Sequence, residues 1–132
     1  MKFYVACKFE DKAWALEAYK LIEEKGHEIT TKWTEHVPIK PYDKNPNASA
    51  YAIEDVIGVI SADYFILKSS KEYSGGKGLF VELGLAIASK LHKGKPEVYI
   101  IGDDMGKAIF YFHPVVKRRE TLEEVLEECG FL

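Results

Sequence analysis

Hydrophobic positions recur along this chain with two alternating spacings. Short runs rich in β-branched and aromatic residues have the composition of buried strands, and the segments between them carry apolar residues at helical spacing. The predicted strands are residues 2–7, 27–33, 64–68, 96–101 and 108–112. The predicted helices are residues 12–25, 47–61, 78–91 and 121–129. Strands that alternate with helices predict a parallel sheet covered on both faces. Five such strands favour a flavodoxin-like (Rossmann-like) doubly wound fold with strand order 2-1-3-4-5.

Residues at the helix ends, and along one helix, refine this picture. Asp11 and Thr121 can cap the first and last helices, and Gly26 can end the first. In the second helix, the buried face is predicted from an apolar stripe that consists of Ile53, Val56, Ile57 and Ile60. Asp55 points away from this stripe, so periodicity alone makes it a solvated residue.

Composition places the chain among ordinary globular proteins. Its 132 residues are 47% hydrophobic and 30% charged, which suits a single domain spanning residues 1–132. No apolar run approaches the roughly 20 residues that a membrane span needs, and the first strand is too short for a signal peptide. We therefore expect a cytoplasmic protein without a membrane partner. A net charge of −3 and a pI of about 5.8 argue against a nucleic acid polymer as partner.

The sequence offers little support for metal or disulfide chemistry. Cys7 and Cys129 lie near opposite ends of the chain and fit no metal-binding spacing, and in a cytoplasmic protein both are expected to be reduced. The four histidines also show no ligand spacing; they are His27, His36, His92 and His113. We therefore expect no metal site and no cofactor.

Three connecting segments converge on one edge of the predicted sheet. In a doubly wound fold, ligands bind beyond the carboxyl ends of the strands, at the point between strands 1 and 3 where the strand order reverses. The segments that reach this edge are residues 7–10, 34–47 and 69–78. The second segment contains three of the five prolines and cannot be regular structure. Long loops in compact domains are often functional, so we expect the ligand at this edge.

An unusual carboxylate follows the third of these segments. Glu82 lies behind the glycine-rich turn of residues 75–78, in an otherwise apolar helix. Its neighbours three and four positions away, none of which can pair with a charge, are Gly78, Leu79, Leu85 and Ala86. An ionised side chain in apolar surroundings is costly, which favours a functional carboxylate. The alternative is structural: in the first helical turn, Glu82 would balance the helix dipole.

Three segments, in order along the chain, carry a resemblance to a known family. They are the opening strand with Tyr4, the motif Thr34-Glu35-His36-Val37, and the stretch from Asp55 through Ala62-Asp63 to Val81-Glu82-Leu83-Gly84-Leu85-Ala86. With the turn Gly94-Lys95-Pro96, most of residues 1–101 resembles the nucleoside 2-deoxyribosyltransferase-like family. Within that family, the chain is most similar to the 2′-deoxynucleoside 5′-phosphate N-hydrolases.

The resemblance implies a chemistry and a role for several residues. Glu82 would attack the anomeric carbon of a deoxyribose, because a carboxylate can capture an oxocarbenium-like centre as a glycosyl ester. Asp55 would donate a proton to the leaving base. Tyr4 would orient the nucleophile by a hydrogen bond, and His36 would lie over the substrate. Many relatives form homodimers or larger homo-oligomers and complete the site with a neighbour's residues.

The connection after the first strand departs from the family pattern. The nucleotide hydrolases hold the 5′-phosphate with a Gly/Ser/Arg-rich turn, whereas this chain has Cys7 and Lys8, followed by Glu10 and Asp11. Cys7 and Lys8 are expected to contact the substrate, and Lys8 can meet a phosphate. Glu10 and Asp11 would repel one, so the resemblance leaves the phosphate state open.

The glycine-rich turn after the third strand is the second expected substrate contact. Its backbone N–H groups can surround an anionic group, and the residues concerned are Gly75, Gly76, Lys77 and Gly78. Transferases of the family often carry an aspartate at the position of Gly76. Its absence here favours hydrolysis over transfer between bases, and it leaves room for an anion near Lys77.

Several of these residues also have an ordinary structural interpretation. Tyr4 can be an ordinary core residue of its strand, and His36 an exposed histidine of a proline-rich loop. The basic run of residues 117–119 is expected to be a solvated patch before the last helix.

Different classes of function remain open at this point. The first is an enzyme that cleaves the N-glycosidic bond of a (deoxy)nucleoside or nucleoside 5′-monophosphate, with hydrolysis favoured over base exchange. The second is a non-catalytic module that binds a nucleotide in the same pocket. A third is a structural protein that buries the apolar helix of residues 79–91 at a subunit interface. The expected partners are a small-molecule nucleoside or nucleotide and further copies of the chain.

Overall fold

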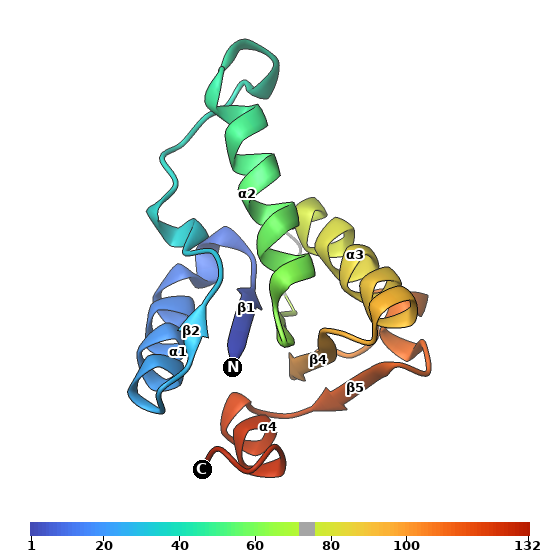
Figure 1. Ribbon diagram of the computed structural model, residues 1–132. Coiled ribbons are helices and arrows are strands. Elements are labelled where there is room, and N and C mark those ends of the chain that lie inside the picture. The colour runs from blue at the N-terminus through green and yellow to red at the C-terminus, as the bar shows by residue number, and fades with distance from the viewer. Residues whose placement is uncertain (72–75) are drawn as a thin grey trace.

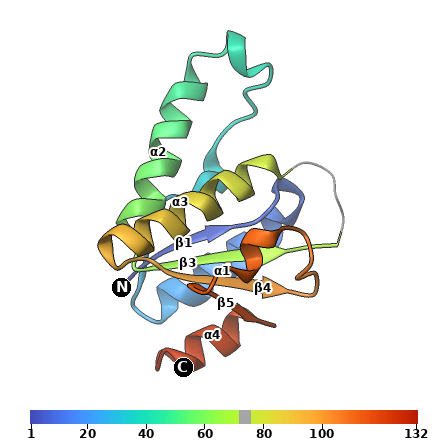
Figure 2. The same ribbon diagram turned by 90° about the vertical axis from the view of Figure 1, so that its right-hand side faces the viewer.

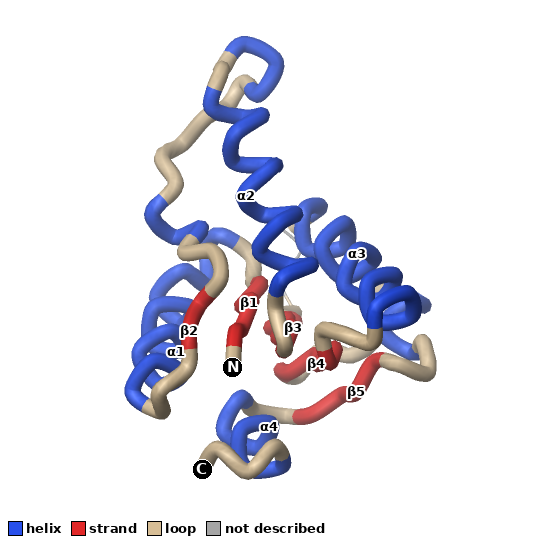
Figure 3. Tube along the Cα trace, in the orientation of Figure 1, coloured by secondary structure: helices blue, strands red, loops and turns tan. Residues whose placement is uncertain are grey.

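The computed structural model describes residues 1–71 and 76–132, which form a five-stranded parallel sheet between two helical layers (Figure 1). The strand order is β2-β1-β3-β4-β5, so the predicted flavodoxin-like fold is confirmed. The strands are β1 (Lys2–Ala6), β2 (Glu28–Ile29), β3 (Tyr64–Ser69), β4 (Glu97–Gly102) and β5 (Val116–Arg119). The α-helices are α1 (Lys12–Glu24), α2 (Asn47–Ser61), α3 (Lys77–Lys93) and α4 (Leu122–Glu128). Short 3-10 helices are η1 (Phe9–Asp11), η2 (Trp33–Glu35), η3 (Tyr42–Lys44) and η4 (Ile109–Phe112), and Figure 3 shows how these elements alternate along the chain.

Side chains of the sheet alternate between two cores. Phe3 and Val5 of β1 belong to the core under α1 and α4, whereas Tyr4 and Ala6 belong to the core under α2 and α3. Figure 2 shows these two pairs of helices on opposite faces of the sheet. Because both faces are buried, the central strands consist almost entirely of apolar residues, as parallel sheets require. Tyr4 is therefore placed by its strand beneath the helices α2 and α3.

Helix α2 presents a different face to the sheet from the one predicted. The predicted stripe is largely exposed, with relative accessibilities of 57% for Ile53, 44% for Val56 and 55% for Ile57. The residues that face inward are Asp55, Gly58, Val59 and Ala62. Small residues are needed here because α2 packs closely on β1 and on the segment after β2: a Cβ on Gly58 would lie 2.1 Å from Thr31 Oγ1 and 3.0 Å from the ring of Tyr4. Hydrophobic periodicity detects large apolar residues. It therefore misses a helix face whose residues are small so that the helix can pack closely on the sheet.

The fifth strand lies later in the chain than predicted. The aromatic run of residues 108–112 forms η4, and β5 occupies Val116–Arg119 at the edge of the sheet. The predicted solvated patch is therefore part of an edge strand. Lys117 and Arg119 lie over the ring of Tyr99, with cation-to-centroid distances of 5.2 and 5.9 Å. Long basic side chains suit an edge strand because their stems cover apolar surface while their charges reach solvent.

Strand β2 is shorter than predicted because its end is tied to α2. After Ile29, Thr30 Oγ1 donates a hydrogen bond to the carbonyl of Gly58 at 2.9 Å, and Thr31 Oγ1 donates to the carbonyl of Glu54 at 3.1 Å. The Thr30 backbone N–H still donates to the Phe3 carbonyl of β1 at 2.9 Å, so the chain leaves β1 after this residue and turns towards the helix. The segment that follows therefore runs beside α2, which stands clear of the sheet at its amino end (Figure 1).

The predicted helix ends are partly confirmed. Thr121 caps α4, since its hydroxyl accepts a hydrogen bond from the Glu124 backbone N–H at 3.1 Å. Gly26 follows α1 with a φ of +86°, a conformation that glycine adopts readily. Asp11 occupies the N-cap position of α1, but its side chain makes no capping hydrogen bond. The Asp11 carboxylate is instead directed to the end of β3, as described below.

Candidate active site

Glu82 lies further from the amino end of helix α3 than the sequence predicts. The helix begins at Lys77, with Gly76 as its N-cap in a left-handed conformation (φ +89°). Glu82 therefore lies in the second turn, and the first turn holds no acidic residue. Because the effect of the helix dipole fades within the first turn, the prediction that Glu82 balances the dipole there is wrong.

Tyr4 and Glu82 are joined directly by a hydrogen bond. Tyr4 is completely buried, and its hydroxyl donates to Glu82 Oε2. The Tyr4 ring stacks on Phe65 of β3 with a centroid separation of 5.8 Å and an interplanar angle of 8°. The phenol is thus fixed by the sheet on one side and by Gly58 on the other. The result is a rigid donor aimed at one oxygen of the carboxylate.

The surroundings of Glu82 favour its neutral form. Burial raises the pKa of the Glu82 carboxyl to about 7, the hydrogen bond from Tyr4 opposes this rise, and the negative charge of Asp55 adds to it. The pKa of Tyr4 is also raised, first by burial and then by the charges of Glu82 and Asp55. Tyr4 therefore stays protonated and can donate throughout the ordinary pH range. A carboxyl that titrates near neutrality is a common property of catalytic groups.

Asp55 projects from α2 towards the same two side chains. Its Oδ1 atom is buried and makes no hydrogen bond to the described residues. Burial raises the pKa of the Asp55 carboxyl, the nearby His36 opposes the rise, and the charge of Glu54 adds to it. A half-buried carboxyl whose neutral form is favoured can keep a proton to donate. The structure thus brings Asp55, Tyr4 and Glu82 together, as the resemblance implies, whereas the periodicity of α2 alone indicates a solvated Asp55.

His36 is held against the outer side of α2. Its Nε2 lies 2.9 Å from Glu54 Oε2, and its ring stacks on Tyr51 with a centroid separation of 3.9 Å and an interplanar angle of 1°. The Tyr51 hydroxyl also accepts a hydrogen bond from the backbone N–H of Val37 at 3.2 Å. These contacts fix the loop after η2 beside Asp55, so His36 borders the site without belonging to the Tyr4–Glu82 pair.

Cys7 and Lys8 lie at the carboxyl end of β1, as predicted. Both are buried, with 6% of Cys7 and 7% of Lys8 accessible. The Cys7 thiol donates to the carbonyl of Asp11 at 3.6 Å. Burial raises the pKa of this thiol to about 12, so Cys7 is neutral and not a nucleophile. It packs in the core under α1 and α4, on the opposite face of the sheet from Tyr4.

The glycine-rich turn is described only in part. Gly75 lies outside the described residues. Gly76 ends the turn, and its carbonyl accepts a hydrogen bond from the Leu79 backbone N–H at 3.1 Å. Lys77 and Gly78 are exposed in the first turn of α3. Their predicted contact with an anion stays a prediction.

At this edge, Lys68 and Ser70 were not singled out from the sequence, and Asp11 was predicted only to cap the first helix and to repel a phosphate. Asp11 Oδ2 accepts a hydrogen bond from Ser70 Oγ at 2.6 Å and lies 3.4 Å from Lys68 Nζ. Lys68 Nζ also lies 5.6 Å from the centroid of the Trp14 ring. No sequence motif marks this cluster, because its members come from separate segments that only the β1–β3 pairing brings together.

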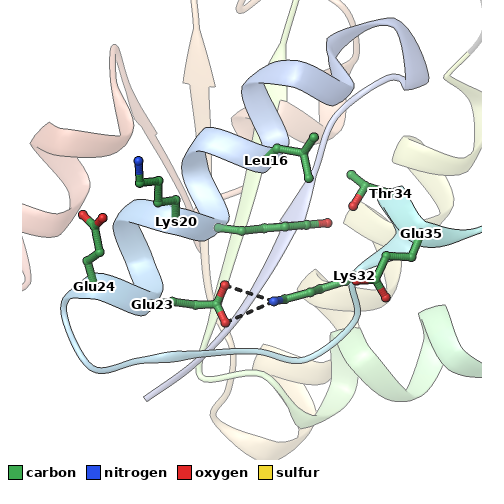
Figure 4. Close-up of a pocket in the computed structure, with 8 residues that line it drawn as sticks. Leu16, Lys20, Glu23, Glu24, Lys32, Thr34 and Glu35 are labelled. Carbon is green, nitrogen blue, oxygen red and sulfur yellow. Dashed lines mark hydrogen bonds and ion pairs between the residues drawn. The ribbon is translucent and has the colours of Figure 1, made fainter.

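One cavity of the structure lies away from these carboxylates. It has a volume of about 530 Å³ and is formed between α1 and the start of η2 (Figure 4). Lys32 bridges its mouth by binding both carboxylate oxygens of Glu23 at 3.0 and 3.1 Å. This hollow faces solvent, is lined mainly by charged side chains and contains none of the side chains Tyr4, Asp55 and Glu82. We therefore place the candidate site by its chemistry at Glu82.

Neither a metal site nor a membrane helix emerges from the described part of the chain. Within residues 1–71 and 76–132, no three His, Cys, Asp or Glu side chains are grouped closely enough to hold a metal ion. None of the helices described is both long and apolar enough to cross a bilayer. Both cysteines are free thiols.

Comparisons with known proteins identify the fold but no family. No protein-family model matches the chain, and no curated protein sequence matches it. Among solved structures, the CMP N-glycosidase BcmB of Clostridium botulinum is similar, with a TM-score of 0.63 and 17% sequence identity. The superposition covers 98% of this chain and 98% of that one. At this identity the similarity establishes a shared fold.

Proposed function

We propose that this protein is an enzyme of the nucleoside 2-deoxyribosyltransferase-like family that cleaves the N-glycosidic bond of a (deoxy)nucleoside or nucleoside 5′-monophosphate. The observation that carries the proposal is the Tyr4–Glu82 hydrogen bond at the ligand edge of the sheet, beside the buried carboxyl of Asp55. The ordered sequence segments and the fold shared with a CMP N-glycosidase support it.

The proposed first step forms a covalent intermediate on Glu82. One carboxylate oxygen of Glu82 bonds to the anomeric carbon while the bond from that carbon to the base nitrogen breaks. The electron pair of the broken bond stays on the base, which takes a proton from Asp55. Tyr4 donates to the other carboxylate oxygen and so fixes the orientation of the nucleophile. A carboxylate is suited to this step because the transition state resembles an oxocarbenium ion.

The proposed second step returns the enzyme to its starting state. A water molecule gives a proton to Asp55, which is now ionised, and attacks the anomeric carbon as the ester bond to Glu82 breaks. The products are a free sugar and a free base. Hydrolysis is favoured over base exchange because Gly76 stands where transferases of the family often carry an aspartate.

Release of free base provides the test of this proposal. The protein is incubated with 2′-deoxynucleosides, ribonucleosides and their 5′-monophosphates, and the products are separated by chromatography. A rapidly quenched reaction is examined by mass spectrometry, and we expect a pentosyl adduct on the peptide that contains Glu82. Absence of free base from every substrate would contradict the proposal. Turnover that is unchanged in Glu82→Ala would contradict the role of Glu82.

A non-catalytic nucleotide-binding module is the second candidate. It is favoured by one observation: the connection after β1 holds Asp11 paired with Lys68 instead of a phosphate-binding turn. A module of this kind would gain thermal stability with nucleotides and release no base over hours. Rapid base release would support the enzyme and contradict the binding module.

We further propose that the chain forms a homodimer or a larger homo-oligomer through α2. The outward stripe of this helix exposes Ile53, Val56 and Ile57, a set of side chains that monomeric surfaces seldom group together. A second copy of the chain is the proposed occupant, because a helical stripe can pack against its own copy about a two-fold axis. Light scattering tests this: we expect an oligomer for the natural chain and a monomer for Ile53→Glu/Ile57→Glu. A natural chain that is monomeric at high concentration contradicts it.

A further inference from the structure

Two adjacent threonines tie the end of β2 to helix α2. Thr30 Oγ1 donates a hydrogen bond to the carbonyl of Gly58 at 2.9 Å, and Thr31 Oγ1 donates to the carbonyl of Glu54 at 3.1 Å. The two carbonyls lie about one helical turn apart, so both threonines bind the same side of the helix. Thr31 is buried, with 8% of its surface accessible. The pair, which we call the threonine clamp, therefore holds one turn of α2 at two points.

The threonine clamp is anchored on the strand that carries Tyr4. The Thr30 backbone N–H donates to the carbonyl of Phe3 at 2.9 Å, and this carbonyl belongs to the peptide bond immediately before Tyr4. Gly58 permits the close approach of the helix, since a Cβ there would lie 2.1 Å from Thr31 Oγ1 and 3.0 Å from the Tyr4 ring. Strand β1, the end of β2 and helix α2 therefore meet within contact distance of one another beside this ring.

Asp55 belongs to the turn that the threonine clamp holds. It lies three residues before Gly58, so the two residues share the face of α2 that is directed at Tyr4. Asp55 Oδ1 is buried and makes no hydrogen bond to the described residues. The backbone of the turn, and not a hydrogen bond to this atom, therefore sets where Oδ1 lies.

We infer that Thr30 and Thr31 are positioning residues for the proposed reaction, because they set how far the carboxyl of Asp55 reaches over Tyr4 towards the leaving base. This inference rests on the proposed function. A general acid works only when its proton is within hydrogen-bond reach of the atom that receives it. A misplacement of about 1 Å is enough to slow a positioned step strongly. Without the two hydroxyl donors the turn can move away from β1, and Asp55 moves with it.

Exchange of threonine for valine tests the inference, since valine keeps the branched shape and removes the donor. Thr30→Val/Thr31→Val should lower kcat for base release about tenfold and leave KM within about twofold, because the contacts with the bound substrate remain. Thr31→Val alone, with a smaller loss of kcat, serves if the double variant does not fold. Valine variants that fold and are as active as the natural chain overturn the inference.

Thr30→Ser/Thr31→Ser is the matched variant, because serine restores both hydroxyl donors. It should return kcat to within about twofold of the natural value, since the loss in the valine variant is assigned to the hydroxyls. A serine variant as slow as the valine variant overturns the inference, because the hydroxyls would then not be the cause.

Asp55→Asn separates positioning from a general loss of structure. If the threonine clamp acts through Asp55, the two valines should change kcat by less than about twofold in the Asp55→Asn background. The loss should also shrink for a substrate whose leaving base needs no proton. Additive losses, or a loss that is equal for both kinds of leaving base, overturn the inference. Thr121→Val is the control: it removes the hydroxyl that caps α4, and it should lower thermal stability without changing kcat.

A measurement without substrate keeps the inference testable if the proposed function fails. If no substrate releases base, the proposed function is wrong, and NMR titration of the Asp55 carboxyl, assigned by comparison with Asp55→Asn, decides whether the threonine clamp positions this group. Burial raises the pKa of Asp55 in the natural chain. A displaced turn would hydrate the carboxyl, so its pKa should fall towards the ordinary value of 3.8 in the valine variant and rise again in the serine variant. A pKa that is unchanged in the valine variant overturns the inference.

Discussion

The two edges of the sheet use the same acidic residue types in opposite ways. At the carboxyl edge, Glu82 accepts its hydrogen bond from a neutral phenol, and burial raises its pKa to about 7. At the amino edge, Glu97 accepts hydrogen bonds from Lys90 at 2.5 Å and Lys117 at 3.2 Å. The bond from Lys90 is the main cause that holds the pKa of Glu97 below its usual value, although burial opposes it. The pKa values of the two glutamates differ because their surroundings differ, since the residue type is the same.

The aspartates of α2 and of the turn after it repeat the contrast. Asp55, at the carboxyl edge, keeps one buried oxygen without a hydrogen bond to the described residues. Asp63, at the amino edge, accepts a hydrogen bond from the Lys2 backbone N–H at 2.8 Å and lies 3.8 Å from Lys95 Nζ. Acidic groups whose oxygens have hydrogen-bond or ion-pair partners stabilise a fold. Buried acidic groups that lack such partners are candidates for a catalytic role. The comparison therefore predicts that substitutions at the two edges have different consequences.

The largest expected effect comes from the two glutamates. Glu82→Gln should lower kcat for base release by at least about 10³-fold, because the amide cannot form the glycosyl ester. Glu97→Gln should leave kcat within about twofold, since its ion pairs lie at the other edge. Both are measured by chromatography of free base, with circular dichroism as the check on folding. Equal losses in the two variants would falsify the assignment of chemistry to the carboxyl edge.

The two aspartates should differ next. Asp55→Asn should lower the rate by about 10²-fold, the usual range for loss of a general acid, because the amide has no proton to give. The loss should shrink for a substrate whose leaving base needs no proton, such as a base already cationic. Asp63→Asn is the control, and it should alter thermal stability more than turnover. A loss in Asp55→Asn that is the same for every leaving group contradicts proton donation.

A smaller effect is expected at the phenol. Tyr4→Phe should lower kcat about tenfold, because the nucleophile loses its orienting hydrogen bond. That bond also favours the ionised form of Glu82, so its loss should raise the pKa of Glu82 further. The acidic limb of the pH–rate profile, expected near pH 7 for the natural chain, should therefore move to higher pH. A limb that stays in place would show that the Tyr4 hydroxyl does not act on Glu82.

The sequence predicts the arrangement of this site better at some residues than at others. The fold follows from the alternation of apolar strands and helical segments, which both faces of a parallel sheet impose. Glu82 stands out because an isolated charge in an apolar helix is visible in the sequence itself. Asp55 does not: the larger apolar residues of α2 indicate the wrong face, and its position follows from how closely Gly58 approaches Tyr4. The Asp11–Ser70 contact depends on strand pairing, which no local pattern encodes.

The smallest effects are expected in stability, and they should have opposite signs at the two edges. The pKa of Glu82 is higher in the folded chain, about 7, than its ordinary value of 4.5. Between these values the folded state binds more protons than the unfolded one, so this group lowers stability as the pH rises from about 4.5 to 7. Glu82→Gln should therefore be more stable than the natural chain at pH 8, by an amount on the order of 2 kcal/mol, and the gain should fade by about pH 5.

Glu97→Gln supplies the opposite case and the control for that measurement. The folded-state pKa of Glu97 is lowered, so its stabilising contribution is present above its ordinary value of 4.5 and is lost as the pH falls through the folded value. Glu97→Gln should be less stable than the natural chain at pH 8, by less than about 1 kcal/mol because its carboxylate is partly exposed. This deficit should disappear in acid. Thermal melts of the three proteins between pH 4 and pH 8 test both signs. If both variants shift in the same direction at pH 8, the two edges do not differ as the structure indicates.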